Sequence, residues 1–305
     1  MDKEPLITKI EAETSALAWI ECVRSFLGPP TTTSKFNLVV GIRNPIALSP
    51  SDEALCRTVD AFLRSKGLQP LITVANTIFP GGFYRDGGAQ AVYEDFPESY
   101  EASRSGWGTY AGRLFADKIQ MKAGPYCRIK RLVDKLRKNL QKSKMRASYE
   151  VDLVDDTIAD EDVSIYCPAT DAGSSRGQPC LVHLSFKLHK DQTVSLTAIY
   201  RSQYYISKAL GNFIGLGQLL AFVAEEAGLT PGYLICHATL ADLDLSFEKT
   251  RWSMRDIGEL LGKCTLASTE RLEEASALAL QDNDCACAGF EMAHTQHNLQ
   301  GARQQ

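Results

Sequence analysis

Residues 178–220 constrain the fold of this chain more than any other segment, because they combine two strand patterns with a long apolar pattern. The segment reads QPCLVHLSFKLHKDQTVSLTAIYRSQYYISKALGNFIGLGQLL. Residues 181–187 and 193–200 are predicted strands, and the HKDQ between them is a hairpin turn signal. Residues 204–228 carry the longest uninterrupted helical pattern, which ends at Gly228. We therefore expect two paired strands followed by a long buried helix.

The rest of the chain mixes helical and strand patterns without strict βαβ alternation, which predicts an α+β fold built on a mixed sheet with flanking helices. The predicted helices cover 8–27, 52–64, 128–141, 253–262 and 268–281, the further predicted strands cover 36–42 and 233–237, and turns are expected at 80–82, 87–88 and 230–232. Residues 1–281 are expected to form one domain. Residues 282–305 are polar and irregular, and we expect a flexible tail there.

Charge and composition exclude several functional classes. The formal net charge of −4 does not predict a nucleic-acid-binding surface. No apolar run approaches the roughly 20 residues of a membrane span, and the acidic N-terminus is wrong for a signal peptide. Nine cysteines, an odd number without framework spacing, fit reduced thiols and a cytoplasmic location. Cys285, Cys287, His294 and His297 match no standard zinc module, so no metal site is predicted.

Four polar side chains within 178–220 form the best candidate for chemistry. Cys180 follows Pro179 at the start of one predicted strand, where a thiol can act as a nucleophile. Arg201 and Ser202 end the next strand, and a guanidinium beside a hydroxyl can share one phosphate. Asn212 lies within the apolar helix, where a buried carboxamide needs a partner such as the edge of a pyrimidine ring.

These residues and their spacing resemble the core of the thymidylate synthase and pyrimidine hydroxymethylase family. That family has a Pro-Cys pair, a strand, a tight turn, an Arg-Ser pair and then an Asn before a small-residue helix. The resemblance implies that Cys180 adds to C6 of a pyrimidine and that Arg201 and Ser202 hold the phosphate. It also implies that Asn212 reads the base, with a preference for uracil.

Two further site residues follow from the same resemblance. The segment from Trp107 to Arg113 resembles the family's Gly-x-x-Tyr-Gly run, which places Tyr110 at the active-site tyrosine. The family's paired arginines fall near Arg146, which would bind the phosphate of the other subunit.

The chain departs from the family at several positions. Leu181 stands where the family has a histidine after the nucleophile, and Tyr204 stands at an aspartate position. Asp242 and Asp244 replace the histidine and tyrosine that hold the sugar, and Asn76 is the polar residue nearest the position of the catalytic glutamate.

The resemblance implies a thymidylate synthase-like sheet, a homodimer, a pyrimidine nucleotide as substrate and 5,10-methylenetetrahydrofolate as cofactor. The expected reaction is transfer of a one-carbon unit to C5 of the pyrimidine through a Cys180 adduct. Because of the departures, two alternatives stay open. The chain could be a non-catalytic nucleotide-binding module on the same scaffold, or an interaction protein whose core resembles the family.

Overall fold

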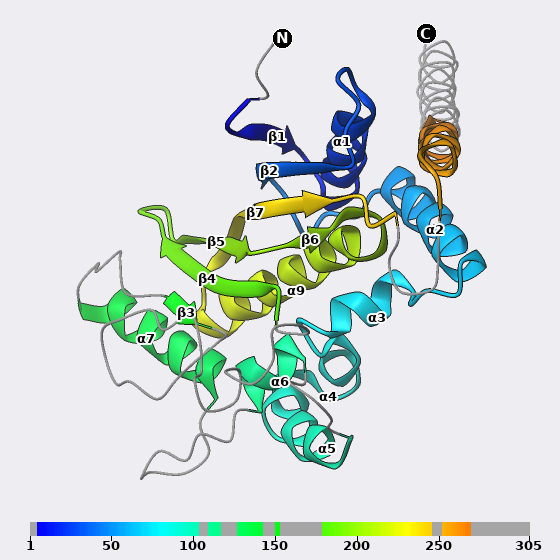
Figure 1. Cartoon of the computed structure of the whole chain (residues 1–305). Helices are drawn as coiled ribbons and strands as arrows, with labels where there is room; N and C mark the ends of the chain where they lie inside the picture. The colour runs from blue at the N-terminus through cyan, green and yellow to red at the C-terminus, as the bar shows by residue number, and fades with distance from the viewer. Residues whose placement is uncertain are drawn as a thin grey trace, which may run out of the picture.

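The computed structural model describes residues 5–103, 109–116, 127–142, 150–152, 179–245 and 252–269. Within these residues a mixed sheet is flanked by helices, which confirms the predicted α+β class (Figure 1). Arg146, Trp107 and the predicted tail at 282–305 lie outside the described residues. The expected single domain over 1–281 stays a prediction.

One seven-stranded sheet forms the centre of the molecule. Its strand order is β1-β2-β7-β5-β4-β3, and the short β6 also pairs with β7. The β1–β2, β5–β7 and β6–β7 pairs are parallel, whereas the other pairs are antiparallel. The strands are β1 Thr8–Ala12, β2 Ser34–Ile42, β3 Glu150–Asp152, β4 Leu181–Leu188, β5 Thr193–Tyr200, β6 Gln203–Tyr204 and β7 Thr230–Asp242.

Helices lie between the strands along the chain. Figure 1 shows α9 running alongside the central strands. They are α1 Ser15–Leu27, α2 Pro50–Ser65, α3 Leu71–Asn76, α4 Gly81–Tyr93, α5 Asp95–Ser103, α6 Tyr110–Phe115, α7 Arg128–Lys142, the π-helix η1 Tyr205–Ala209 and α9 Leu210–Ala227. A further helix covers residues 254–269. The predicted β4–β5 hairpin and the helix over 128–141 are confirmed.

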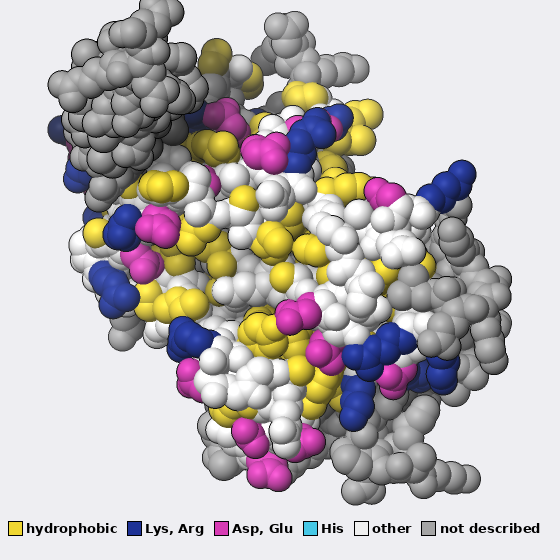
Figure 2. Space-filling view, turned by 180° about the vertical axis from the view of Figure 1, so that it is seen from behind, with side chains coloured by type: hydrophobic (Ala, Val, Ile, Leu, Met, Phe, Trp, Pro, Cys, Tyr) yellow, Lys and Arg dark blue, Asp and Glu magenta, His cyan; other side chains and the backbone are white. Residues whose placement is uncertain are grey.

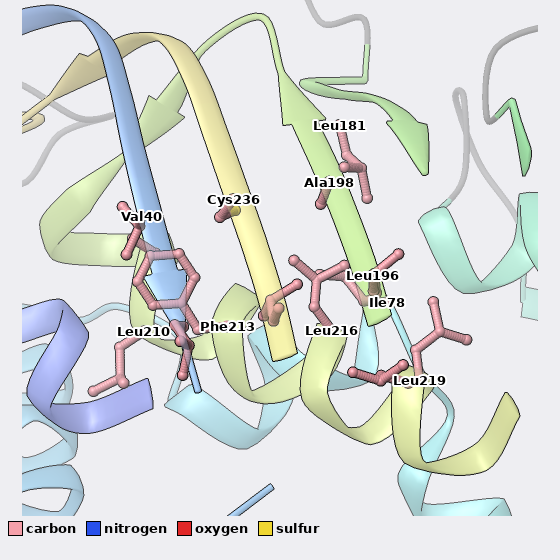
Figure 3. Packing of buried hydrophobic residues seen from close by; sticks show 14 of the residues in the cluster. Val40, Ile78, Leu181, Leu196, Ala198, Leu210, Phe213, Leu216, Leu219 and Cys236 are labelled. Carbon is pink, nitrogen blue, oxygen red and sulfur yellow. The ribbon is translucent and has the colours of Figure 1, made fainter. Parts of the chain in front are cut away.

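The core lies between α9 and the sheet. Phe213 of α9 points toward Val40 of β2 (Figure 3), and Leu210 and Leu216 of α9 belong with Cys236 of β7 to the same buried cluster. All five side chains are buried. Burial of such apolar surface stabilises the fold by roughly 25 cal/mol per Å². The packing of α9 against the sheet therefore contributes to the stability of the fold.

The helical segment Tyr205–Ala227 is long and apolar enough to cross a bilayer, contrary to the expectation from the sequence. In the structure, 78% of the apolar 18-residue stretch of this segment is buried inside the protein. A core helix that packs against a sheet meets the same criteria of length and composition. Its burial therefore agrees with the role of α9 in the core.

Helices α3 and α9 approach each other closely because α9 presents glycines to α3. A Cβ atom added at Gly215 would lie 2.7 Å from the carbonyl oxygen of Ala75, and one at Gly211 would lie 2.6 Å from the Cβ of Val74. Only glycine permits this separation of the two backbones. The contact fixes the end of α3, where Asn76 lies, against the middle of α9.

Residues 8–12 were wrongly predicted as the start of a helix. They form β1, whose side chains alternate between half-buried and exposed positions. Thr14 then caps α1, since its side chain accepts a hydrogen bond from the backbone N–H of Leu17. The apolar spacing of Ile10 and Leu17 fits a helix, but the pairing of β1 with β2 decides the local structure.

Three predicted turns differ from the structure. Gly81 and Gly82 begin α4, and the turn expected at Gly87–Gly88 appears as a kink within that helix, where Gly88 has a φ of 64°. Pro231 lies within β7 opposite Val194 of β5. Because β2 pairs with β7 only from Leu234 onward, the missing N–H of this proline interrupts no ladder on that side.

The remaining differences concern helix ends. The predicted helix over 204–228 is divided into β6, η1 and α9, although it ends at Gly228 as expected, with a left-handed φ of 70°. The break predicted between residues 262 and 268 is absent, since residues 254–269 form one continuous helix.

The surface seen from behind the view of Figure 1 mixes basic and acidic side chains. They lie mainly toward the margin of this face, whereas hydrophobic and uncharged surface fills its middle (Figure 2). On this face the two signs are interspersed.

Candidate functional site

Tyr110 lies beside Cys180, as expected from the resemblance. Its phenolic oxygen accepts hydrogen bonds from the backbone N–H groups of Cys180, at 3.1 Å, and Leu181, at 3.2 Å. Thr109 caps α6 by accepting a hydrogen bond from Gly112, and this cap sets the position of Tyr110. The start of β4 is thus held by a buried side chain 70 residues earlier in the chain.

Arg201 reaches Cys180 from the neighbouring strand. Its backbone N–H donates to the carbonyl oxygen of Cys180 at 2.9 Å, which continues the β4–β5 ladder beyond Tyr200. The Arg201 guanidinium forms a side-chain hydrogen bond to the thiol. The structure therefore brings together three of the predicted site residues: Cys180, Tyr110 and Arg201.

The Cys180 thiol is half-buried, and two effects act on its pKa in opposite directions. Burial raises the pKa, whereas the charge and the hydrogen bond of Arg201 lower it, and the net pKa is above its ordinary value. Burial also raises the pKa of Tyr110 to about 12, and the neighbouring Cys180 adds to this shift. The free protein consequently holds a protonated thiol near neutral pH, with a cation in place to stabilise the thiolate.

Tyr204 is close enough to Cys180 for the two groups to interact electrostatically. Burial raises its pKa, and the charges of Cys180, Asp242 and Asp244 raise it further. Tyr204 pairs in register with Asp242 through the β6–β7 ladder. Tyr204 thus feels the charges of the thiol and of two carboxylates, and it stands at the position where the resembled family has an aspartate.

Asp244 serves the fold. Its carboxylate is buried and accepts hydrogen bonds from the backbone N–H groups of Ile206, at 2.9 Å, and Ser207, at 3.1 Å. These N–H groups belong to the second and third residues of η1, so Asp244 caps the start of the π-helix that leads into α9. Burial raises the pKa of Asp244 to about 6, although its hydrogen bonds oppose the shift.

Asn212 and Ser202 are not part of the contact between Cys180, Tyr110 and Arg201. Asn212 lies in the first turn of α9 and is 6% exposed. Within the described residues, no hydrogen bond engages its carboxamide. Ser202 follows Arg201 and is half-buried. Both residues remain candidates by position, and Arg146 lies outside the described residues.

Asn76 is the last residue of α3. The residue that follows it, Thr77, contacts the start of α6, where Tyr110 lies. The carbonyl oxygen of Thr77 accepts a hydrogen bond from Ala111 at 2.8 Å, which ties the end of α3 to the start of α6. The side-chain oxygen of Asn76 is buried and has no hydrogen-bond partner among the described residues.

Gln218 is a polar residue that the sequence reasoning missed. Its side-chain oxygen is also buried without a partner among the described residues. It follows Gly215 by three positions and therefore continues the face of α9 that packs on α3. The sequence did hold a signal for Gln218. Glycines at 211 and 215 are typical of a close contact between two helices, and Gln218 lies one turn further along the same face.

His237 is the last residue of the strand predicted over 233–237. It is half-buried on β7, and its Nε2 is 3.2 Å from the side-chain oxygen of Asn37. It is satisfied by this contact, although it does not lie in the core.

Comparison with known proteins gives two short similarities and no family model that matches. The chain is 41% identical over 54 residues to a protein named "Putative thymidylate synthase" from Methanococcoides burtonii. It is 38% identical over 56 residues to a protein of the same name from Methanosarcina mazei. Each match covers 18% of this chain, and the chain spans about a quarter of the length of these curated relatives. The matches support a thymidylate synthase-like relationship over this short stretch.

Proposed function

We propose that this chain transfers a one-carbon unit to C5 of a pyrimidine nucleotide through a covalent adduct on Cys180. The observation that carries the proposal is the Arg201 guanidinium hydrogen-bonded to the Cys180 thiol at the paired ends of β5 and β4. A cation at a thiol favours the thiolate, which is the nucleophilic form. The short similarities to proteins named as thymidylate synthases support the same reaction class.

The first chemical step is addition of the Cys180 thiolate to C6 of the pyrimidine. The sulfur–C6 bond forms as the C5–C6 double bond opens, and its electron pair moves through C5 to the oxygen on C4. Asn212, a residue that is 6% exposed, would donate a hydrogen bond from its carboxamide to that oxygen. Later loss of the thiolate restores the double bond.

Arg201 has two tasks in this proposal. A guanidinium has five N–H donors, so it can bond the thiol and still bind a phosphate through its other edge. Arg201 is exposed. Ser202 and Arg146 would complete the phosphate site.

The cofactor 5,10-methylenetetrahydrofolate would supply the one-carbon unit when bound. Its heterocycle carries N–H donors, which need acceptors in the protein. The unpartnered oxygens of Asn76 and Gln218 are such acceptors, so the residues present fit this group.

A second candidate function is binding of a pyrimidine nucleotide without turnover. Removal of the C5 proton needs a base, and the carboxamide of Asn76 has no basic group to offer at neutral pH. Asp244 is already engaged with the N–H groups of η1. These two observations favour a binding module if no other residue supplies the base.

Release of tritium from [5-³H]dUMP in the presence of methylenetetrahydrofolate separates the two functions. The proposal predicts release that is lost in Cys180→Ser. Thermal stabilisation by dUMP without any tritium release would favour the binding module. If no pyrimidine nucleotide stabilises the protein and no tritium is released, the enzyme and the binding module are both excluded. The interaction protein is then the remaining alternative.

We also propose a homodimer that forms through the sheet face opposite α9. Val40 and Cys236 are buried in the cluster that includes residues of α9 (Figure 3), so Val39 and His237, which pair across β2 and β7, point to the opposite face. Both are half-buried, as is Ile199 beside them on β5. Light scattering should give the mass of two chains, and a single-chain mass at micromolar concentration would exclude the dimer.

A further inference from the structure

Helix α2 and the helix over 254–269 pack side by side and run in opposite directions (Figure 1). Ser268, near the end of the later helix, donates a side-chain hydrogen bond at 3.5 Å to the carbonyl oxygen of Ser51, in the first turn of α2. Lys66, directly after α2, forms an ion pair at 3.5 Å with Asp256, near the start of the later helix. The two contacts fix the register of this antiparallel pair at both ends.

This register places one cysteine of each helix at nearly the same level. Cys56 follows Ser51 by five residues and Cys264 precedes Ser268 by four residues. With the rise of an α-helix, these separations correspond to about 7.5 Å and about 6 Å along the helix axes. Counting from the ion pair at the other end gives about 15 Å and about 12 Å. Both counts put the two cysteines within one helical turn of each other.

Both cysteines lie on the inward faces of their helices. Cys264 is fully buried and continues the apolar stripe of Ile257 and Leu261, at the spacing of one helix face. Cys56 is half-buried and packs against the same hydrophobic core. Burial raises the pKa of the Cys264 thiol to about 12, and the neighbouring Cys56 adds to this shift. The electrostatic interaction of the two thiols agrees with the level that the helix register gives them.

Two packed helices can carry a disulfide between residues at one level. The axes of packed helices are about 8–10 Å apart, and each Cα atom lies about 2.3 Å from its axis. Cα atoms that face each other are then about 3.4–5.4 Å apart, and a disulfide spans about 4.4–6.8 Å between Cα atoms. Both thiols are free in the structure, so this bond can form without breaking another one.

We propose that Cys56 and Cys264 form a redox modification site, at which an intramolecular disulfide fastens the helix over 254–269 to α2. The two thiols stay reduced in a reducing compartment, and the bond closes when the protein meets an oxidant. The inference is independent of the proposed function, because the disulfide needs neither a nucleotide nor turnover.

A low-molecular-weight disulfide such as oxidised glutathione is the oxidant. The thiolate of Cys56, the more exposed of the pair, attacks one sulfur of this reagent, so a mixed disulfide forms and one glutathione thiolate leaves. The sulfur of Cys264 then attacks the sulfur of Cys56, and the second glutathione thiolate leaves. The protein loses two electrons and two protons, and both are recovered in two molecules of reduced glutathione.

The rate of this exchange should increase with pH. Burial raises the pKa of the Cys56 thiol to about 12, and the charges of Asp52 and Asp60 raise it further. The thiolate is therefore scarce at neutral pH, and the bond forms slowly there. The site then responds to a lasting change of redox conditions rather than to a brief one.

Incubation of the folded full chain with oxidised glutathione at mildly alkaline pH tests the proposal. After the remaining thiols are blocked, peptide mapping should find the peptides of Cys56 and Cys264 joined, lighter than the two free peptides by two hydrogen atoms. The joined protein should have a Tm at least about 5 °C higher than the reduced protein, because the bond closes a long loop. Dithiothreitol should reverse both changes.

Three variants separate this pair from the other cysteines. Cys56→Ser and Cys264→Ala should each lose the joined peptides and the rise in Tm on oxidation. Cys127→Ser is the matched control, because Cys127 is also half-buried and free, and it should keep both effects. Thermal unfolding of each reduced variant checks that it is folded, and Cys56→Ser alters a half-buried position only.

Several results would overturn the inference. Both thiols still free after oxidation, a different partner for either cysteine, or a link that forms only in urea would show that the folded protein does not bring this pair together. Joined peptides with an unchanged Tm would show that the bond does not fasten the two helices. Each of these results leaves the proposed function untouched, because none of them measures nucleotide binding or turnover.

Discussion

The phenolic oxygen of Tyr110 holds the backbone N–H of Cys180 at 3.1 Å and that of the next residue, Leu181, at 3.2 Å. The contact lies where the β4–β5 register shifts, between Leu181 and His183. An irregular strand start has fewer ladder bonds to fix it, and the phenol takes their place. Tyr110 therefore acts on Cys180 through the backbone, as a positioning residue.

Tyr110→Phe should destabilise the protein and disturb Cys180 together. The substitution leaves two N–H groups without an acceptor, which should lower the free energy of unfolding by about 1–3 kcal/mol. Urea denaturation measures this change. Tyr200→Phe is the matched control, because its buried hydroxyl has no partner among the described residues and its loss should be neutral or stabilising. Equal losses in the two variants would contradict the role of Tyr110.

The pH dependence of Cys180 alkylation should report the charge of Arg201. Since burial raises the thiol pKa above its ordinary value, the alkylation rate should still be rising above about pH 8.5. Arg201 lowers this pKa, so Arg201→Ala should move the inflection to higher pH and slow alkylation at neutral pH. Arg201→Lys should retain much of the effect. An unchanged pH profile in Arg201→Ala would show that the guanidinium does not act on the thiol.

Asp244 should make stability depend on pH in an unusual direction. Its folded-state pKa of about 6 lies above the ordinary aspartate value of 3.8. Its favourable contribution is therefore complete below the unfolded pKa and is lost as the pH rises through about 6. Relative to Asp244→Asn, the wild type should lose roughly 3 kcal/mol between pH 4 and pH 7, at 1.36 kcal/mol for each pKa unit.

The comparison of wild type and Asp244→Asn by urea denaturation at several pH values removes the contribution of other titrating groups. A constant difference between the two proteins from pH 4 to pH 7 would contradict the raised pKa of Asp244.

Gly215→Ala should disrupt the contact between α3 and α9. The added Cβ would lie 2.7 Å from the carbonyl oxygen of Ala75, and such overpacking costs about 1–3 kcal/mol. Gly258→Ala, in the helix over 254–269, meets nothing within 4 Å and should stabilise the protein by about 0.5–1 kcal/mol. Thermal or urea unfolding distinguishes the opposite signs. Destabilisation by both substitutions would show that the close contact is not what requires glycine at 215.

Local patterns predicted the elements in which one signal dominates. The hairpin at 181–200 and the amphipathic helix at 128–141 have uninterrupted periodicity, and both are confirmed. The first strand and the N-terminal part of β7 were missed because partner strands decide them. Thr8 pairs with Leu38, and Pro231 pairs with Val194, across distances that no local window contains.

The candidate site was partly predictable for the same reason. Cys180 and Arg201 belong to neighbouring strands of one hairpin, so their proximity follows from the local pattern. Tyr110 was placed only by resemblance. The structural role of Asp244 depends on a contact 38 residues away, so it could not be read from its surroundings in the sequence. The glycines at 211 and 215 point to Gln218, but the helix that it faces, α3, is distant in the chain.

The most direct test of the account is the mass of the protein after incubation with 5-fluoro-dUMP and 5,10-methylenetetrahydrofolate. With fluorine at C5 no proton can leave, so the adduct formed by the thiol should persist. We predict a mass increase equal to the nucleotide plus the folate, located at Cys180 by peptide mapping and absent in Cys180→Ser. An unmodified wild-type protein, or modification at a different residue, would contradict the claim that Cys180 is the nucleophile.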